Sequence, residues 1–332
     1  MKVMITGGAG FIGSNFILYL HQNYKEYRIL NVDKLTYASD LKFLASIEGS
    51  DRYSFSKTDI TDRAAVRKLI RDFQPDAVIH LAAESHVDNS ISGPEPFVMT
   101  NVVGTFNLLE ECRQFWSEGR RKLSDYRFHH VSTDEVYGSL GESGLFTEET
   151  AYAPNSPYSA TKASSDFMVR SYHHTYGMNV VTTNCSNNFG PHQHDEKLIP
   201  TIVRAALSGA PIPVYGKGEN VRDWLYVGDH CTALDLAFHA GRSGETYNVG
   251  GRNEWKNIDL VKAICNLMND LKGGGPQGDY KNLISFVSDR PGHDLRYAID
   301  ATKIENELGW QNTKDFTKCL TSTIEWYLAR YS

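Results

Sequence analysis

Segments typical of strands and of helices alternate over the first 186 residues, and this alternation limits the fold more than any other feature of the chain. The short apolar runs that we expect to be strands are residues 2–6, 28–33, 53–57, 76–81, 126–132 and 179–184. The segments that we expect to be helical include residues 63–73, much of 94–116 and 158–176. Strands that alternate with helices at this spacing form a parallel sheet with helices on both faces. The chain therefore predicts an α/β, doubly wound parallel (Rossmann-type) sheet, which binds ligands at the carboxyl ends of its strands.

A glycine-rich turn follows the first predicted strand. Gly7, Gly10 and Gly13 form a GxxGxxG pattern, which lets the backbone approach a pyrophosphate at the N-terminus of the next helix. Asp33 ends the second strand, 20 residues after Gly13, where a carboxylate can accept hydrogen bonds from a ribose 2′-hydroxyl. A carboxylate there repels a 2′-phosphate, so the pattern favours NAD over NADP. The GxxxxGK[ST] motif of P-loop NTPases is missing from the sequence.

The alternation weakens after about residue 187, where short elements, glycine and proline become frequent. We expect residues 1–186 to form an NAD-binding Rossmann-type domain and residues 187–332 to form a smaller C-terminal substrate-binding domain. Some segments of the second domain are expected to return to the sheet. Residues 315–331 predict an amphipathic helix.

An unusual group of polar residues follows the fifth predicted strand. In Val131-Ser132-Thr133-Asp134-Glu135-Val136-Tyr137-Gly138 a buried strand leads directly into two adjacent carboxylates. Tyr158 and Lys162 lie four residues apart, on one face of a helix. Such groups are costly to gather near an apolar sheet. We therefore interpret them as acid–base machinery rather than as a polar turn beside an ordinary surface helix.

The composition of the 332 residues is that of a soluble globular protein, with 41% hydrophobic and 22% charged residues. A formal net charge of -6 argues against nucleic acid as the main partner. No segment approaches the roughly 20 apolar residues that span a bilayer, and a strand that begins at residue 2 leaves no room for a signal peptide. The five cysteines are scattered and lack CxxC spacing, as expected of reduced thiols. We expect a cytoplasmic protein without a nucleic-acid or membrane partner.

A pair of histidines invites a metal-site interpretation. His192 and His194 lie two residues apart, near Asp195 and Glu196. Because no third ligand at an established spacing accompanies them, we expect no metal site.

Several sequence blocks resemble a known family. The glycine motif, Asp33 and Tyr158-Ser159-Ala160-Thr161-Lys162 resemble the extended short-chain dehydrogenase/reductase superfamily. Within it, Thr133-Asp134-Glu135-Val136-Tyr137-Gly138 resembles the sugar-nucleotide 4,6-dehydratases. Further matching blocks are residues 81–88, 184–191, 222–227 and 289–294. Together the blocks resemble the branch of that family that acts on dTDP-glucose, and the resemblance covers nearly the whole chain.

The resemblance implies removal of water across carbons 5 and 6 of the hexose, with NAD as an internal hydride shuttle, in the synthesis of dTDP-rhamnose or another deoxysugar. Tyr158, as a phenolate favoured by Lys162 and by the positive charge of the nicotinamide, would be the base for the carbon 4 hydroxyl, and Thr133 would bind the same oxygen. Glu135 would remove the carbon 5 proton, and Asp134 would protonate the departing carbon 6 hydroxyl. Two adjacent carboxylates with opposite duties need separated pKa values. We expect repulsion, aided by burial, to keep Asp134 protonated.

The residue patterns and the resemblance together predict two sets of ligand contacts. The expected cofactor-binding residues are Gly7, Gly10, Phe11, Ile12, Gly13, Asp33, Lys34, Leu35, Thr36, Asp59, Ile60, Leu81, Ala82, Ala83, Ser85, Thr100, Tyr158, Lys162 and Asn188. The expected substrate-binding residues are Ser85, Thr133, Asn187, Lys197, Leu198, Pro213, Tyr215, Arg222, Asn257, Asp289, Arg290 and His293. Arginine side chains suit a diphosphate, and Pro213 with Tyr215 would pack against the base.

Two departures from the family pattern and several alternatives stay open. Phe189 replaces a usual tyrosine, and His194-Asp195 replaces an aromatic residue followed by proline. A UDP-hexose 4-epimerase, a nucleotide-sugar decarboxylase, a 4,6-dehydratase of a CDP-, GDP- or UDP-sugar and an inactive NAD-binding regulator are the alternatives. The Asp134-Glu135 pair favours dehydration, and the intact Tyr158 and Lys162 argue against a regulator. The resemblance also implies a homodimer, joined through the helices within residues 94–116 and 158–176.

Overall fold

The computed structural model describes residues 1–119, 121–275, 278–289, 292–312 and 315–331. Its main sheet has seven parallel strands in the order β10-β6-β5-β4-β1-β2-β3. These strands are β1 (Lys2–Thr6), β2 (Arg28–Asp33), β3 (Tyr53–Lys57), β4 (Ala77–His80), β5 (Arg127–Thr133), β6 (Val180–Cys185) and β10 (Thr246–Val249). The strand order reverses between β1 and β4, which is where such sheets bind ligands. The predicted doubly wound sheet is confirmed.

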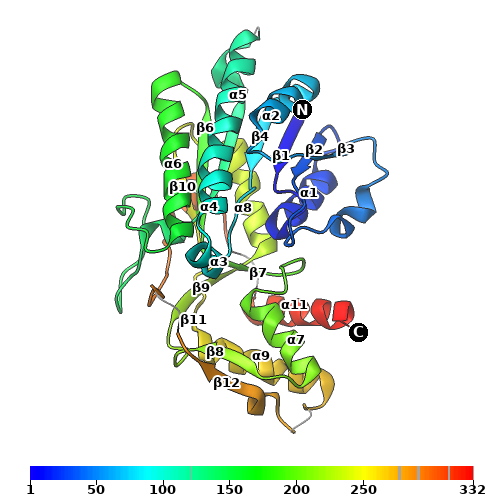
Figure 1. Ribbon diagram of the computed structural model, residues 1–332, viewed down its shortest axis with the longest axis vertical. Helices are drawn as coiled ribbons and strands as arrows, with labels where there is room; N and C mark the ends of the chain where they lie inside the picture. The colour runs from blue at the N-terminus through cyan, green and yellow to red at the C-terminus, as the bar shows by residue number, and fades with distance from the viewer. Residues whose placement is uncertain (120, 276–277, 290–291, 313–314, 332) are drawn as a thin grey trace.

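Helices cover both faces of this sheet (Figure 1). On one face lie α1 (Phe11–Asn23) and α8 (Val227–Ala240), whose apolar residues share a core with β1 and β4. On the other face lie α2 (Arg63–Phe73), α5 (Thr105–Glu118) and α6 (Pro157–Tyr176). The short α10 (Thr302–Leu308) packs beside α8 and β10. The covered faces explain why the strands read as nearly continuous apolar runs.

The long helix expected within residues 94–116 begins later than its apolar pattern suggests. Helix α3 (Val87–Ser92) is followed by α4 (Glu95–Phe97), then by a π-helical turn at Val98–Gly104, and only then by α5. A Cβ added at Gly104 would lie 2.6 Å from the Ile60 side chain, so the glycine lets this turn lie against the segment after β3. Short 3-10 helical turns lie at Leu41–Ile47, Leu123–Asp125, Asp134–Tyr137 and Tyr280–Leu283.

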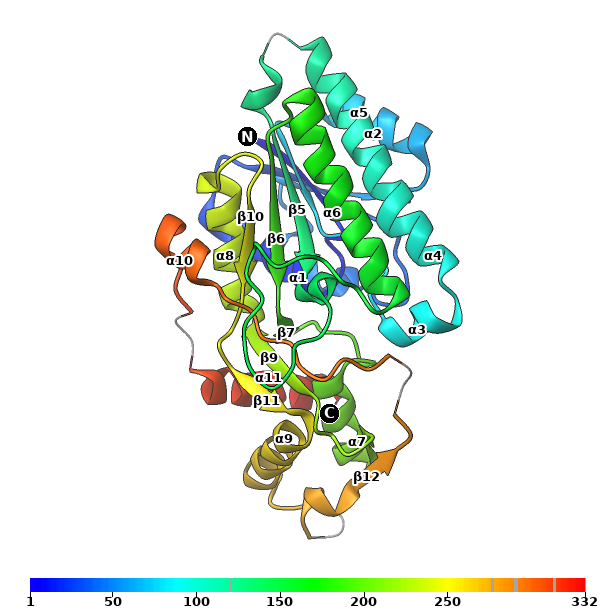
Figure 2. The ribbon, with the colours of Figure 1, turned by 90° about the vertical axis from the view of Figure 1, so that its left-hand side faces the viewer.

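A smaller lobe lies at the carboxyl ends of the strands (Figure 2). It comprises the sheet β11-β9-β7, the strand pair β12-β8 and three helices. Its elements are β7 (Asn187–Phe189), α7 (Leu198–Ser208), β8 (Ile212–Tyr215), β9 (Val221–Tyr226), β11 (Glu254–Lys256), α9 (Asn257–Lys272), β12 (Ile284–Val287) and α11 (Phe316–Tyr331). Between β9 and β11 the chain passes through α8 and β10, which lie on the main sheet. A division into two domains at residue 187 stays a prediction.

The described helices include none that is both long and apolar enough to cross a membrane. All five cysteines are free thiols with buried side chains.

The smaller lobe has an apolar core of its own, which gives the first prediction. Ile264 on α9 is fully buried there, and Ile264→Ala is expected to lower the free energy of unfolding by about 2–5 kcal/mol through cavity formation. Leu271 on the same helix is 37% exposed, so Leu271→Ala is expected to change it by only about 0.5 kcal/mol. Urea unfolding measures both. Equal losses would contradict the packing described for α9.

Candidate active site

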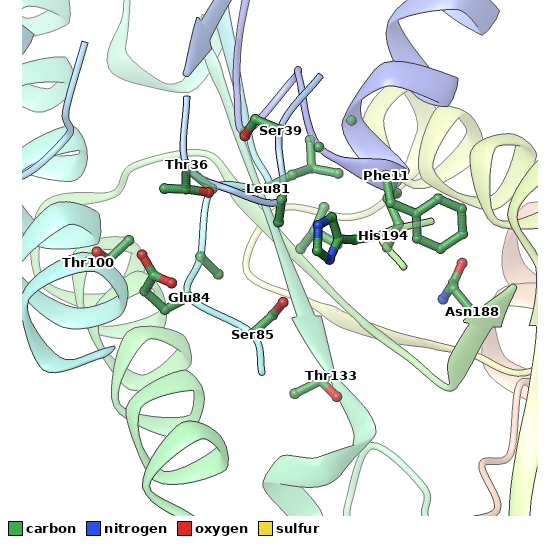
Figure 3. Close-up of a pocket in the computed structure, with 18 of the residues that line it drawn as sticks. Phe11, Thr36, Ser39, Leu81, Glu84, Ser85, Thr100, Thr133, Asn188 and His194 are labelled. Atoms are coloured by element: carbon green, nitrogen blue, oxygen red, sulfur yellow. The ribbon is translucent and has the colours of Figure 1, made fainter. Parts of the chain in front are cut away.

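A cavity of about 310 Å³ opens at the carboxyl ends of the main-sheet strands (Figure 3). The glycine turn after β1 and the segments after β2, β4, β5 and β6 line it. The loop between β7 and α7 contributes Gln193, His194, Glu196 and Lys197. The cavity therefore lies at the reversal of strand order, between the main sheet and the smaller lobe.

The glycine turn brings the backbone close to this cavity. Gly7 has a φ of +73°, and its N–H donates to the Val32 carbonyl at 2.9 Å. A Cβ at Gly13 would lie 2.2 Å from the Gly7 carbonyl oxygen, so a larger residue cannot fit without moving the turn. A Cβ at Gly10 would meet only that oxygen, at 3.3 Å. The turn leads into α1, whose first N–H groups suit a pyrophosphate.

The Asp33 carboxylate is fixed at the edge of the cavity. Its Oδ2 accepts a hydrogen bond from the Ala9 N–H at 3.0 Å. Its Oδ1 accepts from the Leu35 N–H at 2.9 Å and from the Ser39 hydroxyl at 3.0 Å. Donors from the glycine turn and from the loop after β2 therefore hold an acceptor where a dinucleotide places a ribose hydroxyl.

Most of the predicted cofactor contacts line this one cavity. They are Gly7, Gly10, Phe11, Ile12, Gly13, Asp33, Lys34, Thr36, Ile60, Leu81, Ala82, Ala83, Ser85, Thr100, Tyr158, Lys162 and Asn188. Leu35 and Asp59 are not among the described lining residues. Asp59 instead accepts a hydrogen bond from the Thr61 N–H at 2.9 Å, and Leu35 contributes its N–H to Asp33. Beside Thr100, the Lys34 ammonium lies 2.9 Å from a Glu84 carboxylate oxygen.

Sequence reasoning missed several lining residues. They are Val32, Ala38, Ser39, Thr58, Glu84, Val131, Ser132, Cys185, Ser186, Gln193, His194 and Glu196. Most adjoin predicted contacts, so proximity in sequence could have found them. His194 belongs to a loop without periodic pattern, yet its ring lies over the middle of the cavity (Figure 3).

The predicted catalytic residues meet in this cavity. Thr133 ends β5, and its hydroxyl accepts a hydrogen bond from the Glu135 N–H at 3.3 Å, which begins the 3-10 turn that carries both carboxylates. Ser156 caps α6, so Tyr158 and Lys162 lie in its first turns with their side chains buried. All five residues, Thr133, Asp134, Glu135, Tyr158 and Lys162, line the cavity.

Burial sets the protonation of Asp134. Its side chain is 1% exposed, and burial, followed by the charges of Glu135 and Asp223, holds the pKa of its carboxyl well above the usual range. The nearby Arg222 and the Thr133 hydroxyl act in the opposite direction. Among the described residues, its buried Oδ2 has no hydrogen-bond partner. The direction of this shift agrees with the predicted protonated Asp134, and burial contributes more to it than repulsion does.

Tyr158 and Lys162 differ from the expected pair. Burial, together with the Glu135 charge, holds the pKa of the Tyr158 phenol well above its usual value, against a hydrogen bond with Thr133. Burial also lowers the pKa of Lys162, whose ammonium donates to the Val131 carbonyl at 2.9 Å. Without bound NAD the Tyr158 phenol is therefore protonated, and the expected phenolate, which also needs the positive charge of the nicotinamide, stays a prediction.

The predicted substrate contacts fall into two groups. Ser85, Thr133, Asn187 and Lys197 line the cavity. Leu198, Pro213, Tyr215, Arg222, Asn257, Asp289 and His293 are not among its described lining residues, and Arg290 lies outside the described residues. Pro213 and Tyr215 are exposed on β8, and the Tyr215 hydroxyl donates to an Asp88 carboxylate oxygen at 3.3 Å. The structure thus places the predicted contacts that do not line the cavity, apart from Arg290, on the smaller lobe and the segments around it.

Two members of that second group have buried polar atoms. The Arg222 guanidinium lies over the Tyr297 ring, 4.3 Å from its centroid, and donates to the carbonyls of Val221 at 2.8 Å and Asp294 at 3.0 Å. Asn257 begins α9, and its buried Oδ1 finds no partner in the described part of the chain. The Arg222 guanidinium is thus bound within the protein, whereas the Asn257 Oδ1 is a buried acceptor without a donor among the described residues.

The histidine pair near the cavity has structural contacts instead of metal geometry. The His192 ring stacks on Phe43 with centroids 4.2 Å apart, and its Nδ1 lies 2.9 Å from the Ser14 hydroxyl. No group of three or more His, Cys, Asp or Glu side chains among the described residues is placed to hold a metal ion.

The glycine turn gives the second prediction. Gly13→Ala is expected to weaken NAD binding by about tenfold or more, because its Cβ would displace the Gly7 carbonyl. Gly49→Ala is the control, since a Cβ there meets nothing within 4 Å. Calorimetric titration of the NAD-free proteins measures the dissociation constants, and equal values would contradict a dinucleotide at this turn.

Comparison with known proteins agrees with this geometry. A profile of the family described as GDP-mannose 4,6 dehydratase matches residues 4–323. A dTDP-glucose 4,6-dehydratase from Salmonella typhimurium is 52% identical over 339 residues, which cover 99% of this chain and 93% of the relative. A dTDP-glucose 4,6-dehydratase from Xanthomonas campestris is 54% identical over 328 residues, with 98% and 92% covered.

Solved structures give the same result. The structure of a Bacillus anthracis dTDP-glucose 4,6-dehydratase in complex with NAD has a TM-score of 0.87 and 44% identity, with 99% of this chain and 97% of the other covered. That of a Streptomyces venezuelae dTDP-glucose 4,6-dehydratase with NAD and TYD bound has a TM-score of 0.91, 41% identity and the same coverage. A Thermotoga maritima UDP-glucose 4-epimerase shares the fold at 26% identity, with a TM-score of 0.88 and full coverage of both chains. The profile thus identifies the sugar-nucleotide 4,6-dehydratases as a group, and the high sequence identities narrow the assignment to one family within that group. The chain belongs to the sugar-nucleotide 4,6-dehydratases and, within them, to the dTDP-glucose 4,6-dehydratase family.

Proposed function

We propose that the protein is an NAD-dependent hydro-lyase that converts dTDP-glucose into dTDP-4-keto-6-deoxyglucose and water. The observation that carries this proposal is the Asp134-Glu135 pair, which lies with Tyr158 in one cavity beside the glycine turn. A buried, protonated Asp134 next to a second carboxylate supplies the acid and the base that dehydration requires.

The cavity suits NAD. The glycine turn and the first N–H groups of α1 would hold its pyrophosphate, and Asp33 would hold the adenosine ribose. Thr100 lies at one end of the cavity, and Asn188 lies at the other (Figure 3). The Lys34 ammonium donates to the Thr100 hydroxyl at 3.2 Å. Bound NAD supplies the hydride acceptor, later the hydride donor, and a positive charge that favours the Tyr158 phenolate.

The first step is oxidation of the sugar at carbon 4. We assign to Tyr158 the removal of the hydroxyl proton, and to Thr133 a hydrogen bond to the same oxygen. Lys162, one helical turn away on α6, contributes a positive charge near the phenol. The 4-keto group that results acidifies the proton on carbon 5.

The second step is loss of water. Glu135 takes the carbon 5 proton, and Asp134 gives its proton to the carbon 6 hydroxyl as the C–O bond breaks. The partnerless Oδ2 of Asp134 is the atom that we assign to this hydroxyl. Return of the hydride to carbon 6, with a proton to carbon 5, completes the 4-keto-6-deoxy sugar.

Cations and a flat apolar surface would hold the nucleotide part. Lys197 lines the cavity, and Arg222 lies close enough to Asp134 to lower its pKa. We assign the diphosphate to these cations together with Arg290 and Asn257, as the resemblance implies, and the base to Pro213 and Tyr215. The remaining predicted contacts with the nucleotide sugar are Ser85, Asn187, Leu198, Asp289 and His293.

We further propose a cytoplasmic homodimer. The five buried free thiols suit a reducing compartment. Val98 and Met99 before α5 are 45% and 42% exposed, and Phe167 on α6 is 58% exposed. Their apolar side chains support the expected contact of these helices with a second copy. Sedimentation equilibrium tests this, and a monomer at micromolar concentration would exclude it.

The runner-up is a 4,6-dehydratase of another nucleotide sugar, since the matching profile is described by GDP-mannose.

Incubation of the purified protein with dTDP-glucose tests the main proposal. We expect a 4-keto-6-deoxy product without net NADH, and slower turnover of UDP-, CDP- and GDP-sugars. Turnover of one of those sugars alone would keep the chemistry and change the base.

The acid role of Asp134 gives the third prediction. Asp134→Asn keeps the shape of the side chain and removes its proton, so product formation is expected to fall by about 10²–10⁴-fold. Exchange of the carbon 5 proton with solvent is expected to continue, because Glu135 remains. Glu135→Gln is the matched variant and is expected to lose this exchange as well. Mass spectrometry in deuterated water measures both, and an unaltered product rate in Asp134→Asn would contradict the assignment.

Wild-type activity gives the fourth prediction. Because the pKa of Asp134 is raised and its acid form is the reactive one, kcat is expected to fall as the pH rises through that pKa. A pH–rate profile of kcat measures this fall, and activity that is constant up to strongly alkaline pH would contradict it.

A further inference from the structure

A second buried carboxylate lies one helical turn beyond Lys162 on α6. Asp166 is 5% exposed. Its Oδ2 accepts hydrogen bonds from the hydroxyls of Ser132 and Tyr152, both at 2.9 Å, and its Oδ1 lies 3.0 Å from the His130 Nε2. The catalytic steps assigned above leave Asp166 without a role.

The contacts of α6 with β5 have a regular spacing. Lys162 donates to the carbonyl of Val131 at 2.9 Å, and Asp166 accepts from the hydroxyl of the next residue, Ser132, at 2.9 Å. Two residues one turn apart on α6 therefore bind consecutive residues of β5. Thr133 and Asp134 follow immediately. Helix α6 runs along β5 and β6 (Figure 2). The two hydrogen bonds therefore fix α6, which carries Tyr158, against the end of β5 that leads into Asp134.

Asp166 is the principal negatively charged group that acts on Lys162, because the other titratable groups around Asp166 are neutral near pH 7. The charge of Asp166 raises the pKa of Lys162 and is the largest influence on it after burial. Burial lowers the pKa of His130 and raises that of Tyr152 and Tyr137, so all three are neutral near pH 7. Cys185, whose pKa burial raises to about 12, is also neutral.

The histidine contact supports an ionised Asp166. The Nδ1 of His130 has no partner in the described part of the chain, which places the proton of the neutral ring on Nε2, facing Asp166. The carboxylate thus receives three hydrogen bonds. Burial nevertheless raises its pKa to about 6, against the opposing effects of Lys162, Ser132 and Tyr152.

We propose that Asp166 is a positioning residue of the dehydratase reaction, whose buried carboxylate keeps Lys162 charged and aligned with the catalytic end of β5. The proposal rests on the proposed function. Asp166 touches neither sugar nor cofactor in this account. It acts through Lys162, and Lys162 in turn favours ionisation of the Tyr158 phenol.

Asp166→Asn tests this role, because it keeps the shape of the side chain and removes the charge. Without that charge Lys162 loses its proton at lower pH, and wherever Lys162 becomes neutral the Tyr158 phenol ionises at higher pH. We expect the acid limb of kcat/KM to move up by about one pH unit, which is a tenfold loss on that limb. The KM for dTDP-glucose is expected to stay within about twofold, since Asp166 is not a substrate contact. If Asp166→Asn does not fold, the smaller neutral variant Asp166→Ser carries the same expectation.

Tyr152→Phe is the matched control. It removes one hydrogen bond to the same Oδ2 and leaves the carboxyl group in place. Because this hydrogen bond lowers the pKa of Asp166, the control is expected to show a lower Tm and an acid limb that moves less than that of Asp166→Asn. Asp166→Glu keeps the charge and is expected to keep the limb near its wild-type position. If Asp166→Asn shows a lower Tm with an unmoved limb, Asp166 is merely structural and the proposal is overturned.

A readout that does not need turnover separates this proposal from the proposed function. The tyrosinate absorbance of Tyr158, taken as the difference between wild type and Tyr158→Phe with NAD present, is titrated with pH. Asp166→Asn is expected to raise its midpoint. A raised midpoint in a protein that converts no sugar nucleotide would support the role of Asp166 and overturn the proposed function. An unmoved midpoint in a protein that converts dTDP-glucose would overturn only the role of Asp166.

Discussion

Exclusion of water from the carboxyl end of β5 is the constraint on which the site depends. Burial is the largest influence on Asp134, on the Tyr158 phenol and on Lys162 alike, and it disfavours the charged form of each. The proposed acid of the dehydration step, Asp134, is thereby prepared in the protein itself. The proposed base for the carbon 4 hydroxyl is not, because burial raises the pKa of the Tyr158 phenol and further positive charge is needed to ionise it. The charge of Asp166 opposes the effect of burial at one residue, because it raises the pKa of Lys162. The site thus combines one acid held neutral with one cation held charged, both within a single apolar sheet.

The smaller lobe contributes to the same cavity through a loop that its own core positions. Residues 193–197 connect β7 with α7 and reach over the cavity. The C-terminal helix α11 holds this loop, since the Tyr327 hydroxyl donates to the Gln193 carbonyl at 2.6 Å and the Tyr331 hydroxyl donates to Asp195 at 2.5 Å. Packing of a helix remote from the chemistry therefore decides where the loop lies.

The sheet and the catalytic cluster could be predicted from the sequence because local patterns encode them. The apolar runs predicted the bounds of β4 and β5 to within a residue or two, and the polar residues after β5 were recognisable because they follow an apolar run directly. The beginning of α5 was less predictable, since a π-helical turn continues the apolar pattern of a helix. The loop at His194 has no pattern, so only tertiary packing reveals it. The raised pKa of the Tyr158 phenol also escaped prediction, because burial, its largest cause, depends on tertiary packing.

The protonation state of Asp134 at neutral pH decides whether burial holds the proton of the proposed acid. An infrared difference spectrum between wild type and Asp134→Asn isolates the absorption of this one carboxyl group. We predict a protonated carboxylic acid band at pH 7 that gives way to a carboxylate band only at higher pH. A carboxylate band alone at pH 7 would show that burial does not hold the proton, and the acid of the dehydration step would have to lie elsewhere.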